Sequence, residues 1–550
     1  MRLRLAFLAL AAALVAGCAT PPPAAPVKVM VLAINDFHGN LKPPLGGIRI
    51  HDPSGKLVSV EAGGAEHLDT AVAQLVAKNP NHIFVAAGDL IGASPLLSAV
   101  FHDEPTVESL GLMGLEASAV GNHEFDKGAA ELLRMQRGGC NTSDGCKGPH
   151  PFQGAQYQYL AASTVDAKTG QTLFPAYYIK RFQGIPVAFI GLTLKGTPAI
   201  VVPAGVAGLR FDDEAETVNR LVPELQRQGV QAIVVLIHEG GVPTGDYNEC
   251  PGISGPIVGI VKRLDKAVDV VISGHTHRAY NCRIDGRLVT SGDKYGTLVT
   301  EIDLVLDPAT RDVLSATADN HIVRTSLAKA PRQTELIAQY ERLSLALTQR
   351  VVGRIGANLP REGNAAGESP LGQVIADAQL AATRSPEAGG ARIAFMNPGG
   401  IRAPLSLPAD GLLRYEHLFS VQPFYNNLVT MTLSGAQILQ LLEQQWSGQG
   451  AAGRILHVSQ GFGYAWDAAR PAGQRVVPGS VKLAGRPLEP AAGYRVTVNA
   501  FMAGGGDGFL VLKDGRERRT GMMDVDALEL YVKAHPTLAP GPLDRIARLN

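Results

Sequence analysis

Five short polar segments in the first half of the chain are rich in histidine and acidic residues. Each directly follows an apolar run that is typical of a buried β-strand. The segments are NDFHG (35–39), GD (88–89), GNHEFD (121–126), HE (238–239) and GHTH (274–277). Ligands gather at strand ends in open α/β sheets, so we expect these segments to converge on one cleft.

Seven side chains in these segments are candidate metal ligands, and none of them is a thiolate. Mixed oxygen and nitrogen donors suit Zn, Mn, Fe, Co or Ni rather than Ca. Seven ligands are too many for one tetrahedral ion but suit two ions about 4 Å apart, which can activate water as a nucleophile. The predicted assignment is Asp36, His38 and His277 to one ion, Asn122, His238 and His275 to the other, and Asp89 as the bridge.

Short apolar strands that alternate with helices must position these groups. The predicted strands of the first half are 29–34, 83–87, 117–120, 187–190, 233–237 and 268–272, with helical patterns such as 65–78 and 214–228 between several of them. Unbroken apolar strands between helices indicate an α/β fold in which helices bury both faces of a sheet.

The second half begins after one long predicted helix at 331–351, which we interpret as the connector. Beyond it we predict helices at 371–384 and 436–446 and strands at 393–396, 428–433 and 494–499. The predicted division is a signal at 1–18, a tether at 19–27, a first domain at 28–328, a linker helix at 329–352 and a second domain at 353–550.

The composition limits the classes of protein that remain. Fifty Lys and Arg residues balance fifty Asp and Glu residues in a chain of 550, which argues against a dedicated nucleic-acid-binding protein. Hydrophobic residues make up 45%, enough to build large cores, and exclude global disorder. We expect a monomer that binds no nucleic acid.

The N-terminus is predicted to be an export signal. Arg2 and Arg4 precede an apolar run at 5–16 that is too short to span a bilayer comfortably. The sequence LVAGC (14–18) resembles the bacterial lipoprotein cleavage box, and an ordinary signal peptide with an incidental cysteine is the alternative. We therefore expect a protein of the periplasm or cell envelope that is anchored to the membrane by a lipid on Cys18.

Export implies an oxidising compartment in which the remaining cysteines form disulfides. Four cysteines allow three pairings. Cys140 and Cys146 flank a short polar turn that can close on itself, which leaves Cys250 to pair with Cys282. A zinc site is the alternative, but neither pair has CxxC spacing.

Taken in order, NDFHG, GD, GNHEFD, His238 and GHTH resemble the calcineurin-like metallophosphoesterases, and GNHEFD is similar to their 5′-nucleotidase branch. The second half resembles that branch's C-terminal domain through NPGGIR (397–402), PFYN (423–426) and FMAGGGDGF (501–509). The resemblance covers about residues 28 to 548. It implies a four-layer αββα sandwich that a helical linker joins to a smaller α/β substrate-binding domain.

The activity that this resemblance implies is metal-dependent hydrolysis of nucleoside monophosphates. UDP-sugar hydrolysis and 2′,3′-cyclic phosphodiesterase activity use the same centre and stay open. A thiosulfohydrolase-type metallohydrolase and a non-catalytic surface lipoprotein that retains the fold are the alternatives. A small sulfur substrate has no base to stack, however, and none of the seven ligands is missing.

Two groups beside the ligands are predicted to assist catalysis. His123 adjoins Asn122 and can stabilise the phosphate or protonate the leaving ribose oxygen. Asp126, three residues further on, can hydrogen-bond to His123 and set its tautomer.

The second domain is predicted to bind the substrate. The Arg402 fork matches a phosphate, Phe424 and Phe501 can stack on a base from loops, and Asp507 can accept hydrogen bonds from ribose hydroxyls. The full predicted set is Asn397, Arg402, Phe424, Asn426, Phe501 and Asp507.

Two positions depart from the pattern of the family. The family has a further arginine shortly before the helix that begins here near residue 371, whereas this chain reads GESP (367–370) and has its nearest arginine at Arg361. His277 stands where some members carry glutamine, which is expected to change metal preference rather than competence.

Overall fold

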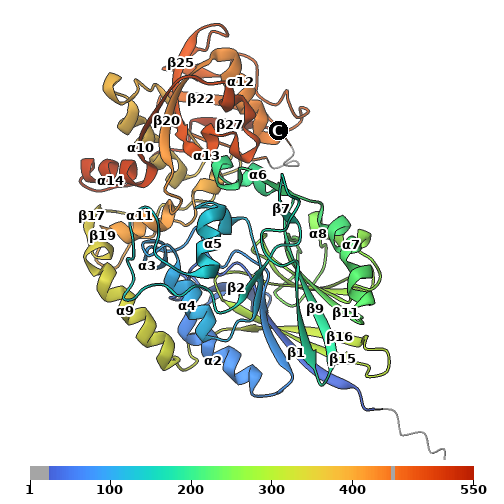
Figure 1. Ribbon diagram of the computed structural model, residues 1–550. Coiled ribbons are helices and arrows are strands. Elements are labelled where there is room, and N and C mark those ends of the chain that lie inside the picture. The colour runs from blue at the N-terminus through green and yellow to red at the C-terminus, as the bar shows by residue number, and fades with distance from the viewer. Residues whose placement is uncertain (1–23, 448–452) are drawn as a thin grey trace, which may run out of the picture.

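The computed structural model describes residues 24–447 and 453–550 (Figure 1). The predicted signal, Cys18 and most of the predicted tether therefore lie outside the described residues. Within the described part of the chain, no helix combines the length and the apolar character needed to cross a membrane.

The first of two large sheets in the first domain has the order β16-β15-β1-β4-β5-β6. Its parallel strands are β1 (Val27–Ile34), β4 (His82–Ala86), β5 (Ala117–Ala119) and β6 (Gln158–Leu160). The strands β15 (Leu298–Leu306) and β16 (Val313–Ile322) add antiparallel pairs beyond β1. The C-terminal end of β4 therefore lies beside that of β1, and the end of β5 lies beside that of β4.

The second large sheet has the order β13-β14-β12-β11-β9-β8. Its parallel strands are β9 (Ile185–Thr193), β11 (Ala232–His238), β12 (Val270–Ser273) and β14 (Arg287–Gly292). The edge strands β8 (Tyr177–Phe182) and β13 (Ala279–Ile284) pair antiparallel.

The two sheets pack face to face, because alternate residues of each strand meet different partners. In β1, Val29 and Val31 share a core with Val187 and Val234 of the second sheet. Leu32 points the other way, into the core under the helices α2 (Ala65–Val76), α4 (Glu104–Leu112) and α5 (Ala129–Arg137). The helices α7 (Glu214–Arg227) and α8 (Pro256–Arg263) cover the outer face of the second sheet.

The four-layer αββα sandwich is therefore confirmed. The simpler interpretation, helices on both faces of one sheet, was wrong, because a strand buried on both faces reads the same whether its second partner is a helix or another sheet.

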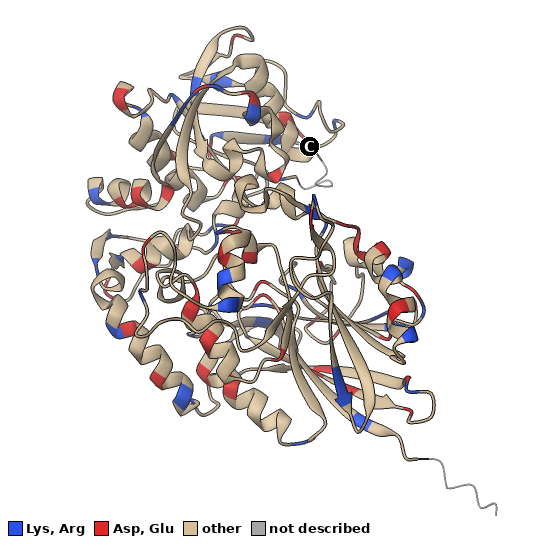
Figure 2. Cartoon of the chain, viewed as in Figure 1, with Lys and Arg blue, Asp and Glu red and all other residues tan. Residues whose placement is uncertain are grey.

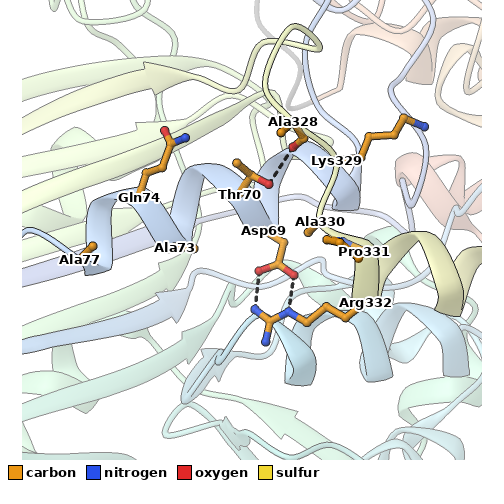
Figure 3. Close-up of a pocket in the computed structure, with 10 residues that line it drawn as sticks. All are labelled: Asp69, Thr70, Ala73, Gln74, Ala77, Ala328, Lys329, Ala330, Pro331 and Arg332. Atoms are coloured by element: carbon orange, nitrogen blue, oxygen red, sulfur yellow. Dashed lines mark hydrogen bonds and ion pairs between the residues drawn. The ribbon is translucent and has the colours of Figure 1, made fainter.

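The linker helix α9 (Pro331–Thr348) packs along the first domain and is tied to it at its N-terminal end. As Figure 3 shows, the Arg332 guanidinium makes two hydrogen bonds to Asp69 on α2, at 2.7 Å and 2.5 Å, and the Thr70 hydroxyl donates to the carbonyl of Ala328 at 2.7 Å. Polar residues that line this groove hydrogen-bond to one another. These hydrogen bonds hold the linker against the first domain.

The second domain, drawn above the first in Figure 1, is built on a five-stranded sheet with the order β21-β18-β25-β20-β26. Its strands are β18 (Ile393–Met396), β20 (Asn427–Ser434), β21 (His457–Val458), β25 (Gly493–Asn499) and β26 (Arg516–Met523), with the helices α10 (Pro370–Thr383), α12 (Gly435–Glu443) and α14 (Asp524–Ala534). A smaller sheet contains β22 (Phe462–Asp467), β23 (Lys482–Leu483), β24 (Arg486–Pro487) and β27 (Ile546–Leu549).

The domains share a hydrophobic cluster at their boundary. Leu96 and Ala99 on α3 (Leu96–Ala99) pack with Phe419 on α11 (Tyr415–Val421) of the second domain. Both predicted disulfides, Cys140–Cys146 and Cys250–Cys282, are formed. Positively and negatively charged residues are interspersed along the helices in Figure 2, in keeping with zero net charge.

Candidate metal centre and active site

The C-terminal ends of four strands of the two sheets, β1, β4, β11 and β12, bring six acidic and imidazole ligands together in two groups. The ligand atoms of each group lie within 4.8 Å of one another. The groups are Asp36, His38 and His277, and Asp89, His238 and His275. The strands that carry them come from both sheets, so the stacking of the sheets builds the site.

Asp89 belongs to the second group and also lies beside the first. Its Oδ2 atom is 3.0 Å from His238 Nε2 and 3.5 Å from His38 Nε2. One carboxylate oxygen therefore adjoins ligands of both groups, which is the position that a bridging ligand requires. The Oδ1 atom of Asn122 is buried and has no hydrogen-bond partner, as expected of an amide oxygen directed at a cation.

The hydrogen bonds of the imidazoles show which ring nitrogen of each histidine is free to bind a metal ion. Nδ1 of His38 lies 2.9 Å from the carbonyl of Gly92, and Nδ1 of His238 lies 2.8 Å from the carbonyl of Ala87. A carbonyl only accepts, so each Nδ1 donates, and in the neutral form of each ring Nε2 then presents a lone pair. For His38 that lone pair faces His277 Nε2 at 3.2 Å. Converging lone pairs and carboxylates fit divalent cations.

Burial keeps most of these imidazoles in the form that binds metal. It lowers the pKa of His38 to about 3 and that of His275 to about 3. It also lowers the pKa of His277 to about 4. Burial alone would raise the pKa of Asp89, but the neighbouring imidazoles, His238 first, hold it well below its usual range. The carboxylate is therefore ionised and these three imidazoles are neutral.

Five of the predicted ligands have backbone angles in the left-handed region. Their φ values are 51° for Asp36, 46° for His38, 51° for Asp89, 70° for His275 and 53° for His277. Non-glycine residues rarely adopt this region, and each costs on the order of 1–3 kcal/mol. Such strain persists only where the surroundings enforce it, and its concentration here marks the site as functional.

Glu124 helps to enforce this geometry and was missed by the sequence analysis. Its buried carboxylate accepts hydrogen bonds from the backbone N–H groups of Asp89, Leu90 and Gly121 at 3.0, 2.8 and 2.7 Å. The loops after β4 and β5 are thereby clamped together. Its place inside GNHEFD, next to His123, was the signal that could have identified it.

Gly121 permits the close approach of these two loops. A Cβ atom on Gly121 would lie 2.2 Å from Asp89 Oδ1, which only glycine avoids.

His123 and Asp126 lie at the edge of the metal centre as a hydrogen-bonded pair. Nδ1 of His123 is 2.8 Å from Asp126 Oδ2, and the backbone N–H of His123 donates to Asp89 Oδ1 at 2.9 Å. Burial acts to lower the pKa of His123, but the carboxylates of Asp126 and Asp89 outweigh it and raise the pKa. Because Nδ1 faces Asp126, Nε2 is the ring nitrogen left for a substrate.

Arg402 of the second domain reaches the metal centre across the domain boundary. It follows the short helix η4 (Pro398–Gly400), and its guanidinium carbon lies 5.7 Å from the ring centroid of Tyr295 in the first domain. Its Nε and Nη2 atoms are buried and have no hydrogen-bond partner. Arg361 donates a hydrogen bond from Nη1 to the carbonyl of Arg402, so it lies beside the same site.

Phe424 and Phe501 occupy different local structures. Phe424 lies in a turn after α11, as predicted, and its ring stacks on that of His123. Phe501 lies on the short helix α13 (Ala500–Ala503) rather than in a loop, because Asn499 caps that helix and accepts a hydrogen bond from Met502. A Cβ atom on Gly506 would meet the Phe501 ring at 2.5 Å, so glycine is required beside this ring.

The remaining predicted substrate residues are held in a hydrogen-bonded frame. Asn397 donates from Nδ2 to Asp507 Oδ2 at 2.7 Å and accepts from Asn499 at 2.9 Å. Arg454 pairs with Asp507 Oδ1 at 3.0 Å. Asn426 is buried, and its side-chain oxygen accepts from the backbone N–H of Phe501 at 3.2 Å. Asn397 and Asn426 thus position Asp507 and Phe501.

Comparison with known proteins follows the division into two domains. A family model for calcineurin-like phosphoesterases matches residues 29–279, and one for the C-terminal domain of 5′-nucleotidases matches residues 348–514. The crystal structure of a 5′-nucleotidase precursor from Thermus thermophilus is similar with a TM-score of 0.76 and 28% identity, covering 95% of this chain and all of that one. The first domain is thus a metallophosphoesterase domain. The second domain contains the C-terminal domain of the 5′-nucleotidase family.

Two curated relatives extend beyond the region that they share with this chain. An endonuclease of Bacillus subtilis is 30% identical over 92% of this chain, and a cell wall protein of Listeria monocytogenes is 31% identical over 88% of it. The chain spans 40% of the length of the first and 64% of the length of the second.

Proposed function

We propose that this protein is a dimetal-dependent phosphohydrolase that releases phosphate from nucleoside 5′-monophosphates. One relationship carries the proposal. The second domain delivers the buried, unpartnered guanidinium edge of Arg402 to a site where six acidic and imidazole ligands converge. A phosphate group suits both Arg402 and the converging ligands, because its oxygens bind divalent cations and accept two hydrogen bonds from a guanidinium fork.

Bound divalent ions would supply Lewis-acid stabilisation and an activated water molecule. The residues of the chain account for the other requirements. Arg402 orients the phosphate and stabilises the charge that develops on its oxygens. His123 donates a proton from Nε2 to the leaving ribose oxygen, while Asp126 fixes the tautomer from the other side of the ring. Phe424, Phe501 and Asp507 hold the nucleoside.

The substrate range is tested by one assay of the purified protein from residue 24 onward. AMP, UDP-glucose, 2′,3′-cyclic AMP, thiosulfate esters, single-stranded DNA and a simple aryl phosphate are compared with Zn, Mn, Co, Ni or Fe supplied separately. Release of phosphate from AMP in preference to the aryl phosphate supports the proposal. A preference for the sulfur ester, cleavage of DNA alone, or no hydrolysis with any metal contradicts it.

We also propose that the protein is exported and held in the cell envelope by a lipid on Cys18. Two formed disulfides and the similarity to a cell wall protein support export. Metabolic labelling with a radioactive fatty acid should mark the wild-type protein and not a Cys18→Ser variant. Equal labelling of both would refute the anchor.

A further inference from the structure

Tyr295 is a first-domain residue that the sequence analysis did not single out, yet it lies where the two domains meet. It is placed in the loop between β14 and β15 with a left-handed φ of 59°. Its backbone N–H donates to the carbonyl of Asp36 at 2.7 Å. Its ring centroid lies 6.0 Å from that of His38 and 5.8 Å from that of His277. The hydrogen bond ties this loop to the backbone of Asp36, a predicted metal ligand, and so holds the ring beside the metal centre.

The Arg402 guanidinium lies over this ring from the second domain, 5.7 Å from its centroid. The ammonium group of Lys294 lies 5.2 Å from the same centroid. An aromatic face attracts cations without neutralising them, so the ring gathers positive charge beside the metal centre.

A second arginine of this chain shows how a structural cation–π contact differs. The Arg350 guanidinium lies 4.5 Å from the ring centroid of Tyr415, and it also pairs with Glu529, with Nη2 2.8 Å from Oε2. Its charge is satisfied within the protein. In contrast, the Nε and Nη2 atoms of Arg402 are buried without a hydrogen-bond partner. A carboxylate partner would compete with an incoming anion for these N–H groups, and a ring does not.

We propose that Tyr295 is a positioning residue, which holds Arg402 over the metal centre through a cation–π contact between the domains. The ring orients the guanidinium plane and leaves its N–H edge free for a phosphate. Tyr295 therefore sets the affinity of the site for phosphate without touching the reacting atoms. The inference rests on the proposed function only in taking a phosphate group as the ligand of Arg402.

The test compares Tyr295→Phe, Tyr295→Leu, Arg402→Ala and the double variant Tyr295→Leu/Arg402→Ala. Binding of inorganic phosphate to the metal-loaded protein is measured by calorimetry, with metal content and kinetics on an aryl phosphate measured in parallel. Tyr295→Phe keeps the ring and should stay within about threefold of wild type, whereas Tyr295→Leu should weaken phosphate binding about tenfold and retain its metals. The double variant should bind phosphate no more weakly than Arg402→Ala alone, because the two residues act as a unit.

Tyr415→Leu is the matched control, because it removes the corresponding ring from Arg350 away from the metal centre. It should leave phosphate affinity unchanged. Additive losses in the double variant, loss of metal from Tyr295→Leu, or wild-type phosphate affinity in Tyr295→Leu would each overturn the inference. Failure to hydrolyse AMP would instead count against the proposed function, because phosphate binding is measured without a nucleotide.

Discussion

The ring of His123 stacks on the ring of Phe424 across the domain boundary, with the centroids 6.0 Å apart and the planes 23° apart. His123 belongs to the metal centre of the first domain, and Phe424 belongs to the second domain. The proposed proton donor and one proposed base-stacking ring are therefore neighbours. The site that this contact completes is assembled from both domains, so its chemistry and its substrate choice can be separated by variants on either side.

Asp89→Asn is expected to abolish hydrolysis of every substrate. The carboxylate belongs to one ligand group and lies beside the other, and an amide cannot share a negative charge between two dications. Rates on AMP and on an aryl phosphate are measured in metal-replete buffer, together with metal content. If the variant retains more than about a tenth of the wild-type rate, then Asp89 is not the bridging ligand.

His123→Ala is expected to keep its metals and to lower the rate by roughly 10²–10⁴, the usual span for loss of a general acid. The Asp126 contact supports this role, because it directs Nδ1 away from the substrate and leaves Nε2 to donate. Metal analysis beside the kinetics separates the two possible roles. If the variant loses an ion, then His123 is a ligand and the assignment of roles is wrong.

The elements of the fold were predictable from the sequence because its strands are continuous apolar runs. The predicted strand 393–396 is the observed β18, and the predicted helix 214–228 ends one residue beyond the observed α7. The order of the ligand motifs was visible for the same reason, since each motif directly follows such a strand. Local pattern and position in the chain were sufficient for these features.

Features that depend on contacts between distant segments were not predictable. Nothing in the sequence marks Asp36 or His275 for a left-handed backbone, because tertiary packing rather than residue type imposes it. Glu124 reads as an ordinary acidic residue until its carboxylate meets three backbone N–H groups of two loops. The role proposed for Tyr295 depends on the second domain, which places Arg402 over its ring.

Asp524 is expected to make the stability of the protein depend on pH. Burial raises the pKa of this carboxyl group to about 8 from its usual 3.8, and its Oδ2 atom has no hydrogen-bond partner. The folded state therefore binds the proton more tightly than the unfolded state does. The contribution of Asp524 to stability is fully present below about pH 4 and is lost as the pH rises toward about 8.

Thermal unfolding of the wild type and of Asp524→Asn between pH 5 and 8 checks this expectation. The amide cannot ionise, so the Tm of the variant minus that of the wild type should increase with pH. Asp526→Asn, two residues further along α14 and only partly buried, is the matched control and should show a smaller change. A difference that stays constant over this range would mean that Asp524 does not ionise in the folded protein.

Substrate choice is expected to depend on the two phenylalanines of the second domain. A base stacked between two rings gains roughly 1–3 kcal/mol, judged from base–aromatic stacking. The double variant Phe424→Ala/Phe501→Ala should therefore lose kcat/KM for AMP by about tenfold to a few hundredfold. Because Phe424 also stacks on His123, its removal can disturb the chemistry as well as the binding of the base.

Phe501→Ala alone separates these two effects. Phe501 packs over Gly506 within the second domain, beside the frame that holds Asp507. This variant should lower kcat/KM for AMP and leave hydrolysis of an aryl phosphate, which has no base to place there, nearly unchanged. Phe424→Ala should also slow the aryl phosphate if the contact with His123 orients the proton donor. Equal losses on both substrates in Phe501→Ala would mean that this ring supports the fold, and the assignment of a nucleoside pocket to the second domain would then have to rest on Phe424 and Asp507.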